Sequence, residues 1–469
     1  MGQQGRPQPG ALPERVECMT KANNERSRAL VEEESAYMAP TARIPYYDMV
    51  VDHGRGAKIY DVDGNEYIDL ISSASATNVG HCHPRVVKAV CDQAQKLLLY
   101  SPAYMYQEPE IKLVEKLCQI APGDTPKKAV FGTSGSDAND AVMKFARAYT
   151  GRPYMITFQG SYHGSTYGSM SLSGLSLNMV RKMGPLVPGI YHIPYPDSFH
   201  QGVDHLSEEE QVEYFMRPLL DMTSMYLPPD EVACVLMEPI AGDMGIIPAP
   251  PAYMRALYAW CQEHGILFAV DEINQGMGRS GTWWSIEHYG IEPDLMSVGK
   301  SIASGLPLSA IVGKADIMDA LSFPAHIFTT SGNPVCCAAA LATIGAIEDE
   351  HLLERGTELG EFARARFQKM VDEHPIAAAV HGCGLNLGVD IMELGTRTKS
   401  AQMALKIVYR AFELGVVIIT YADSVLRFQP PLVIERDELD RALDVIDQCI
   451  GEVERGEVPD DLVPAGKGW

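Results

Sequence analysis

Short, almost continuously apolar runs recur through the first two thirds of the chain, and stretches with helical spacing separate them. A strand that is apolar on both sides must be buried on both faces, which is typical of a parallel sheet between two layers of helices. The pattern therefore predicts an α/β fold. The expected strands are KKAVFGT, YMITFQG, VACVLMEPI, ILFAVDEI, DLMSV and LSAIVG, and the expected helices include VKAVCDQAQKLLL and DANDAVMKFARAY.

The length of the chain predicts more than one lobe, because 469 residues exceed what a single hydrophobic core usually serves. Beyond about residue 336, a long helical region leads into shorter strand-like pieces, which predicts a smaller α+β lobe. IYDVDGNEYIDL has the pattern of a hairpin with a DG turn, and we expect it to pack on the small lobe or to bridge the two. The expected divisions are a disordered extension (1–25), an N-terminal segment packing with the small domain (26–75), a large domain (76–335) and a C-terminal small domain (336–469).

The balance of charges argues against two classes of partner. Lys and Arg number 38 and Asp and Glu number 61, so the formal net charge is −23. Such a surface repels nucleic acid and anionic membranes, and no apolar run reaches the length of a membrane span. The 10 cysteines include no CxxC pair, which is typical of reduced thiols. We therefore expect a cytoplasmic protein that binds neither nucleic acid nor membrane.

Two charged residues follow apolar strands at the edge where parallel sheets collect their chemistry. Asp271 ends the apolar run ILFAV at the start of ILFAVDEI, and Lys300 follows DLMSV after one glycine. A buried carboxylate needs a cationic or hydrogen-bonding partner, and desolvation turns a lysine into a nucleophile that can form an imine. The alternatives are an ordinary buried ion pair for Asp271 and a loop position for Lys300.

The segment FGTSGSDAND predicts an anion site where a strand runs into a helix. The free backbone N–H groups and the helix dipole at such a junction favour negative charge. Gly135 would let a phosphate approach the backbone, and Ser136 would add a hydroxyl group. The alternative is an N-capped helix after a flexible turn.

Tyr162, in GSYHGST, also follows a strand and could stack on a planar ring, although taken alone it fits a half-buried loop residue at a domain edge better. Together with Lys300, Asp271 and the phosphate turn, it predicts pyridoxal 5′-phosphate as the cofactor. That cofactor requires an imine-forming lysine, an acid at its pyridinium nitrogen and a phosphate cup. GMGRSG matches a dinucleotide-binding pattern, but no acidic residue ends the following strand, so this alternative is disfavoured.

The motifs together resemble the class III (subgroup II) aminotransferase family, pyridoxal phosphate enzymes of fold type I. This resemblance implies a large domain with a mostly parallel seven-stranded sheet and a smaller α+β domain. It also implies a homodimer or a tetramer of dimers, with active sites at the subunit interface and a small-molecule substrate, an amino acid. The matching segments are DVDGNEYIDL, NVGHCHP, TSGSDAN, SYHGST, MEPIAGD, VDEINQGMGRSG, SVGKSIASGLPLSA, TTSGNP and LRFQPPL.

The resemblance also implies a role for each site residue. Lys300 would carry the cofactor, Asp271 would pair with its pyridine nitrogen and Tyr162 would stack on its ring. Arg427 would bind the substrate carboxylate through two parallel hydrogen bonds. No metal is expected. The remaining cofactor-binding candidates are Ser134, Gly135, Ser136, Glu238, Asn274 and Thr330, with Thr329 reaching over from the partner subunit.

Two departures from the family pattern suggest a particular reaction. Asn274 stands where the family usually has Gln, and Asp243 lies in EPIAGDMG, where the family usually has EPxQGEGG. Within the family, the chain looks closest to epimerases of branched-chain amino acids, and inversion at Cα needs a second acid/base opposite Lys300. We expect Asp243 to fill that role, with Tyr162 as a possible link, although Asp243 could instead pair with an arginine. The expected function is a racemase of nonpolar amino acids; the alternatives are an aminotransferase and a cofactor-binding protein without turnover.

Overall fold

The computed structural model describes residues 24–44 and 46–464, and most of the expected N-terminal extension therefore lies outside the described residues. The last residue of that extension, Glu25, begins the first helix. No helix within the described ranges has the length and apolar character that crossing a membrane requires. The helices are α1 (Glu25–Ser35), α2 (Ser72–Ser75), α3 (Pro84–Lys96), α4 (Glu108–Ile120), α5 (Gly135–Thr150), α6 (Tyr167–Leu172), α7 (Glu208–Met225), α8 (Pro251–Glu263), α9 (Ala315–Met318), α10 (Pro334–Asp349), α11 (Leu352–Glu373), α12 (Ala401–Glu413) and α13 (Arg436–Glu454).

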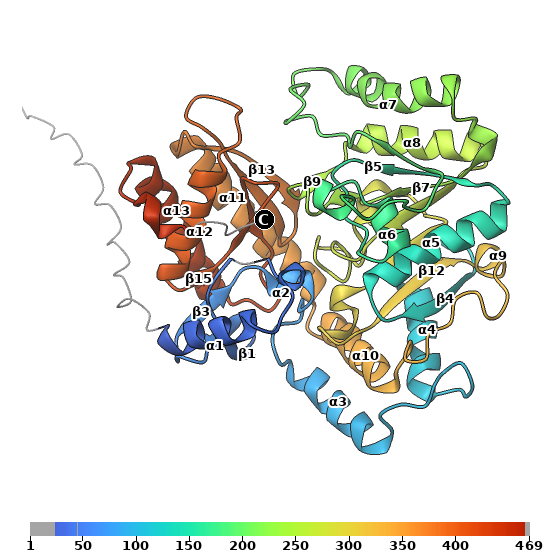
Figure 1. The fold of residues 1–469 in the computed structure, drawn as a ribbon, viewed down its shortest axis with the longest axis horizontal. Helices are drawn as coiled ribbons and strands as arrows, with labels where there is room; N and C mark the ends of the chain where they lie inside the picture. Colours follow the sequence, from blue (N-terminus) through green and yellow to red (C-terminus); the bar gives the residue numbers. More distant parts are fainter. Residues whose placement is uncertain (1–23, 45, 465–469) are drawn as a thin grey trace, which may run out of the picture.

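A seven-stranded sheet forms the centre of the larger part of the molecule (Figure 1). All six expected strands are present in it, and the structure adds β6, whose short IYHI segment the apolar pattern did not reveal. The sheet is mostly parallel, as expected; β12 alone runs antiparallel to both of its neighbours. Because only a single 3-10 turn (Lys300–Ala303) links β11 to β12, the chain lacks the long crossover that a parallel pair needs. The strand order is β4 (Lys127–Gly132), β12 (Ser309–Lys314), β11 (Leu295–Val298), β10 (Leu267–Asp271), β7 (Val232–Met237), β5 (Tyr154–Phe158) and β6 (Ile190–Ile193).

The burial of β10 explains why the strands of this sheet read as continuous apolar runs. Phe268 and Val270 belong to the main core cluster, whereas Leu267 and Ala269 belong to a second cluster that includes residues of α5. Successive side chains of a strand point to opposite faces, so both faces of the sheet are covered. The apolar pattern therefore predicted the layered fold correctly.

A second, antiparallel sheet lies in the C-terminal part of the chain, with α11, α12 and α13 beside it (Figure 1). The expected hairpin near the start is confirmed as β2 and β3, and β3 pairs with β15 from the C-terminal part. The order of the second sheet is β13 (Ala377–Cys383), β14 (Asn386–Ile391), β17 (Val425–Phe428) and β16 (Ile419–Tyr421). The remaining strands are β1 (Val51–Arg55), β2 (Lys58–Asp61), β3 (Glu66–Asp69), β15 (Val416–Val417), β8 (Ile240–Ala241) and β9 (Ile247–Pro248).

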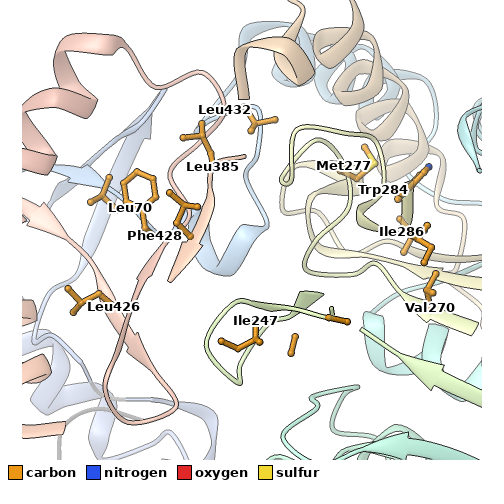
Figure 2. Packing of buried hydrophobic residues seen from close by; sticks show 14 of the residues in the cluster. Leu70, Ile247, Val270, Met277, Trp284, Ile286, Leu385, Leu426, Phe428 and Leu432 are labelled. Atoms are coloured by element: carbon orange, nitrogen blue, oxygen red, sulfur yellow. The ribbon is translucent and has the colours of Figure 1, made fainter. Parts of the chain in front are cut away.

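One continuous core connects the two sheets. Leu426 and Phe428 of β17 and Val270 of β10 belong to the same cluster of buried side chains (Figure 2). Trp284, which follows β10, is fully buried in that cluster, and its indole N–H donates to the carbonyl of Ile120. The carboxyl ends of the central strands are thus held against the second sheet, and the candidate site lies at these ends.

Candidate active site

A cavity of about 150 Å³ lies at the carboxyl ends of β4, β5, β7, β10 and β11. The residues that line it come from segments far apart in the sequence. Five of them were predicted from their positions after strands, and Glu238, Asp243 and Asn274 from the family resemblance. Among the predicted site residues, Ser134, Thr329, Thr330 and Arg427 do not line it. The lining residues are Gly135, Ser136, Tyr162, His163, Gly164, Glu238, Asp243, Asp271, Ile273, Asn274 and Lys300.

The turn between β4 and α5 forms one end of the cavity. Ser134 caps α5, since its hydroxyl accepts a hydrogen bond from the N–H of Asp137 and the Asp137 carboxylate accepts one from the N–H of Ser134. The Ser134 side chain is therefore occupied, while Gly135 and Ser136 face the cavity at the start of the helix. A helix N-terminus with its N–H groups towards a cavity is suited to binding a phosphate.

Two glycines keep this end of the cavity narrow. A Cβ atom on Gly135 would lie 2.7 Å from Cδ1 of Ile273, and one on Gly164 would lie 2.4 Å from Oγ of Ser136. Gly164 also has a φ of +133°, a backbone conformation that residues with a side chain rarely adopt. Neither position has room for a side chain, and the Ser136 hydroxyl is held in turn by the N–H of Ser165 at 3.0 Å.

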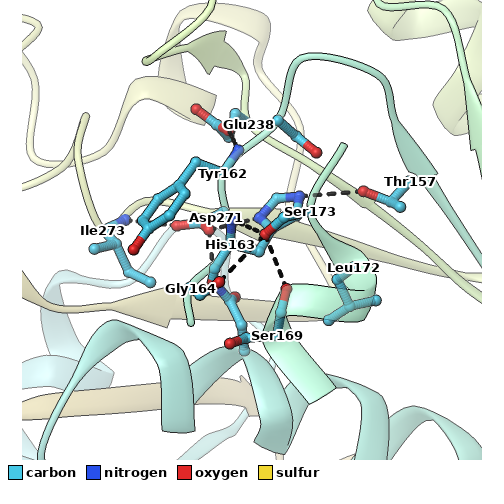
Figure 3. Close-up of polar contacts among 12 residues, drawn as sticks. Thr157, Tyr162, His163, Gly164, Ser169, Leu172, Ser173, Glu238, Asp271 and Ile273 are labelled. Atoms are coloured by element: carbon cyan, nitrogen blue, oxygen red, sulfur yellow. Dashed lines mark hydrogen bonds and ion pairs between the residues drawn. The ribbon is translucent and has the colours of Figure 1, made fainter. Parts of the chain in front are cut away.

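Asp271 is buried and is held by three hydrogen bonds (Figure 3). Its Oδ2 accepts from Nδ2 of Asn139 at 2.7 Å and from Nδ1 of His163 at 2.8 Å. Its Oδ1 accepts from the N–H of Ile273 at 3.0 Å and has the capacity to accept one more donor. The carboxylate is thus oriented rigidly at the wall of the cavity.

Tyr162 is positioned by the loop that follows β5. Its N–H donates to Oε1 of Glu238 at 3.0 Å, and its hydroxyl lies 3.0 Å from Oγ of Ser165. Among the described residues this hydroxyl is hydrogen-bonded to Ser165 and makes no hydrogen bond with Asp243, so the suggested link between Tyr162 and Asp243 stays a prediction. The ring itself lines the cavity, where it could stack on a planar ligand (Figure 3).

Lys300 follows β11 with a backbone φ of 47°, in the left-handed region. Its amine makes no hydrogen bond or ion pair with any of the described residues. Burial lowers the pKa of this amine; the carboxylates of Asp243, Asp271 and Glu238 oppose that shift, and the Arg427 guanidinium adds to it. Lys300 is therefore a half-buried residue whose unpaired amine has a lowered pKa, as a nucleophilic lysine should have.

Two acidic residues come from the segment that follows β7. Burial raises the pKa of Glu238 to about 7, and its Oε2 accepts a hydrogen bond from the N–H of Gly242 at 2.6 Å. Asp243 is half-buried and lines the same cavity as Lys300. Its negative charge opposes the lowering of the pKa that burial causes at both Lys300 and Arg427. Asp243 and Lys300 therefore face the same space from different strands.

Arg427 lies on β17, behind the cavity wall. It is 2% exposed, and its Cζ lies 4.1 Å from the centre of the Tyr421 ring. Burial lowers its pKa to about 10, a shift that the nearby Asp243 carboxylate opposes. Its Nη2 has no hydrogen-bond partner within the described part of the chain. A buried guanidinium with a free donor can bind an anionic group.

The structure also identifies residues whose roles the sequence did not predict. Asn139 and His163 hold Asp271, and Gln429 joins Arg427 to Asn274. A weak signal was present for Asn139, which is a polar residue on the buried face of the amphipathic helix α5. Within the described ranges, no cluster of His, Cys, Asp and Glu side chains is arranged to hold a metal ion.

Comparison with known proteins identifies relatives along most of the chain. The model of the class-III aminotransferase family matches residues 38–450. An isoleucine 2-epimerase of Lentilactobacillus buchneri is 54% identical over 95% of this chain and 99% of its own length. A leucine/methionine racemase of Thermococcus litoralis is 41% identical over 95% of this chain and 100% of its own length. A solved transaminase from the marine bacterium Virgibacillus superposes with a TM-score of 0.84 at 27% identity, covering 92% of this chain and 100% of its own. The family match includes every site residue described above.

Proposed function

The chain belongs to the class-III aminotransferase family, and on this basis we propose that it is a pyridoxal phosphate-dependent racemase or 2-epimerase of nonpolar amino acids, including branched-chain ones such as isoleucine. The 54% and 41% identical relatives, which are named for reactions of this class, support the proposal. The structural observation that carries it is that Lys300 and Asp243 face one cavity.

The residues around the cavity fit pyridoxal phosphate. Lys300 would form the covalent link to its aldehyde, and the free capacity of Asp271 Oδ1 suits the pyridinium N–H. Gly135 and Ser136 would hold the phosphate, since a side chain at Gly135 would collide with Ile273. When bound, the cofactor withdraws electrons from the amino acid and thereby acidifies the proton on Cα. Asp271 would support this effect by keeping the ring nitrogen protonated.

Inversion at Cα requires a proton to leave one face and another to arrive at the opposite face. Lys300, once free of the cofactor, would move the proton on one face, because its lowered pKa lets the neutral amine accept it. Asp243 would move the proton on the other face, since it lines the same cavity from the segment after β7. In one direction Lys300 would take the proton from Cα and Asp243 would deliver one, so that Lys300 ends protonated and Asp243 deprotonated. In the reverse direction, starting from the opposite enantiomer, Asp243 would take the proton and Lys300 would deliver one.

Arg427 would bind the substrate carboxylate. Its unpartnered Nη2 and its burial support this role, because an unpaired buried charge gains strongly from a carboxylate partner. Asn274 would donate to the phenolic oxygen of the cofactor, and Glu238 would support the ring region through the N–H of Tyr162. The roles of Asn274 and Glu238 towards the cofactor stay predictions.

We also propose a homodimer in which Thr329 and Thr330 reach the phosphate site of the second copy. Both threonines are exposed and lie outside the cavity of their own chain. Tyr104 and Tyr106 are 78% and 93% exposed, and exposed apolar patches often mark interfaces. Assembly into a tetramer of dimers and a cytoplasmic location remain predictions.

We keep the domain division as a further proposal. In it, residues 76–335 form the large cofactor-binding domain, and residues 26–75 pack with the small domain of residues 336–469. The pairing of β3 with β15 supports the second part. In one respect the packing favours a different boundary: α10 packs on α3 and α4 of the large domain, so the change of domain would follow Asp349 instead of residue 335.

The second candidate function is an aminotransferase, which the structural likeness to a transaminase supports. A single experiment separates the candidates: one enantiomer of isoleucine or leucine is added to the cofactor-loaded enzyme without any keto acid. A racemase or epimerase converts many equivalents to the opposite configuration at Cα. An aminotransferase releases about one equivalent of keto acid per site and stops, and that outcome would overturn the proposal.

A further inference from the structure

Gln429 directly follows β17, two residues after Arg427, and is fully buried. Its Oε1 accepts a hydrogen bond from Nε of Arg427 at 2.5 Å. Its Nε2 donates to Oδ1 of Asn386 at 2.5 Å and, over a longer 3.4 Å, to Oδ1 of Asn274. One side chain thus contacts both the arginine proposed for the substrate carboxylate and the amide proposed for the cofactor.

The direction of these hydrogen bonds follows from the chemistry of Arg427. A guanidinium has donors and no acceptor, so Gln429 must present its oxygen to Arg427 and its NH₂ group to the other side. Asn274 must then accept with its oxygen, and its own NH₂ group points away from Gln429. The same direction continues through Asn386, whose Nδ2 donates to Oε1 of Gln275.

The position of the Asn274 NH₂ group agrees with this direction. A Cβ atom on Gly242 would lie 2.5 Å from Nδ2 of Asn274 and 3.2 Å from Oε2 of Glu238. The amide N–H groups of Asn274 therefore lie on the side of Gly242 and Glu238, and Glu238 lines the cavity together with Asn274. A donor on that side suits a phenolate oxygen.

We propose that Gln429 is a positioning residue that couples the two halves of the active site. It holds Arg427 through Nε, which leaves the outer guanidinium nitrogens for a carboxylate, and it turns Asn274 so that N–H faces the cofactor. This inference rests on the proposed function. It explains how the short Asn274 side chain is kept in one orientation, where the family usually has the longer glutamine.

Two substitutions at position 429 separate the coupling from simple packing. Gln429→Leu removes the contacts to Arg427 and Asn274 at similar volume. Gln429→Glu is nearly isosteric and can still accept from Arg427, but it has no donor for Asn274 and it neutralises the guanidinium. Ser72→Ala is the matched control, because the Ser72 hydroxyl donates to the backbone carbonyl of Gln429 at 2.6 Å and leaves its side chain alone.

The test uses two binding measurements on the full-length protein. The first is the Kd of pyridoxal phosphate for the apoenzyme, obtained by titration. The second is the ratio of the affinities of L-leucine and L-leucinamide for the cofactor-loaded enzyme, measured by the change in cofactor absorbance. Because leucinamide lacks the carboxylate, this ratio isolates the contribution of the carboxylate to binding. Because hydrogen bonds to a charged group contribute strongly, we expect each variant at position 429 to weaken pyridoxal phosphate binding and the preference for leucine by about tenfold each. Ser72→Ala should change neither by more than about twofold.

Three results would overturn the inference. If the pyridoxal phosphate Kd and the leucine-to-leucinamide affinity ratio both stay within about twofold of wild type in both variants at position 429, Gln429 positions neither Arg427 nor Asn274. If Ser72→Ala lost as much pyridoxal phosphate affinity and leucine preference as the variants at position 429, packing around residue 429 would explain the losses, and the side chain of Gln429 would couple nothing. Wild-type protein that binds no pyridoxal phosphate would overturn the proposed function first and this inference with it.

Discussion

The imidazole of His163 donates through Nδ1 to Oδ2 of Asp271 over 2.8 Å, with both side chains buried. The other ring nitrogen, Nε2, lies 3.1 Å from the hydroxyl of Thr157 (Figure 3). In the neutral ring Nε2 must accept, so the Thr157 hydroxyl donates and fixes the tautomer. A chain of three residues therefore sets the orientation of the carboxylate that we assign to the cofactor nitrogen.

His163→Phe should weaken the cofactor chemistry while leaving the fold intact, because the ring volume is kept and the donor to Asp271 is lost. One hydrogen bond to a charged group is worth about 1.5–3 kcal/mol, so we expect kcat to fall by at least about tenfold. Thr157→Val, which removes only the outer contact, should have a smaller effect. An unchanged kcat and an unchanged pyridoxal phosphate Kd in His163→Phe would contradict this prediction.

Lys300→Ala should abolish turnover and the visible absorbance of the covalently held cofactor. The reason is that Lys300 supplies both the covalent link and one acid/base. Spectra of the purified variant, after addition of pyridoxal phosphate and gel filtration, measure the first effect. Racemisation at the wild-type rate would show that the assignment of Lys300 is wrong.

Asp243→Asn keeps the size of the side chain, but the amide can neither accept nor release a proton as the carboxyl group does. Net racemisation should fall by about 10²-fold or more, the usual contribution of a positioned acid/base. Exchange of the α-proton with deuterated water should survive for the enantiomer that faces Lys300 and collapse for the other, as measured by proton NMR. Equal losses for both enantiomers would indicate a structural role, and no loss would leave Lys300 acting on both faces.

Arg427→Ala should raise KM for amino acids by about ten- to a hundredfold, since a two-point contact from a charged group to a carboxylate is lost. The cofactor should stay bound, because Lys300 and Asp271 remain. Arg427→Lys is the matched variant. It keeps the charge but loses the planar pair of donors, so its KM should lie between that of the wild type and that of Arg427→Ala. If KM and kcat stay unchanged in both variants, the carboxylate binds elsewhere.

His200 should make the stability of the fold depend on pH. Burial alone would lower its pKa, but hydrogen bonds to the carboxylates of Asp197 and Asp390 raise it to about 9. Because the folded-state pKa lies above the ordinary value of 6.5, this stabilisation is complete below about pH 6.5 and is lost as the pH rises through about 9. The loss amounts to no more than about 3 kcal/mol.

The measurement for His200 is the melting temperature between pH 6 and 10, compared with that of His200→Gln. The substitution should lower the melting temperature at pH 6.5 and flatten its decline towards pH 9, because the neutral amide cannot titrate. His381, which also contacts Asp390 at 2.5 Å, remains in the variant and stays near the carboxylate. A variant that declines as steeply as the wild type would show that His200 is not the group responsible.

Much of the fold could be predicted from the sequence because burial leaves a local signature. Strands covered on both faces must be apolar throughout, so six of the seven central strands and the β2–β3 hairpin were found from their runs. The short β6 was missed because a histidine interrupts its apolar run, and β13 was missed because its run consists largely of alanine, which is depleted in strands. The antiparallel direction of β12 was missed as well, because it depends on the short link from β11.

The site was predictable to the extent that its residues follow strands. Parallel strands bring their carboxyl ends to one edge, so the sequence by itself determined that Asp271, Lys300, Tyr162 and the turn at Gly135 share a cavity. Only the tertiary structure decided what holds them. His163 and Asp271 are 108 positions apart in the sequence, and Gln429 and Asn274 are 155 apart. Hydrogen bonds between such distant side chains depend on the relative placement of whole elements, and no local pattern of apolar and polar residues records that placement.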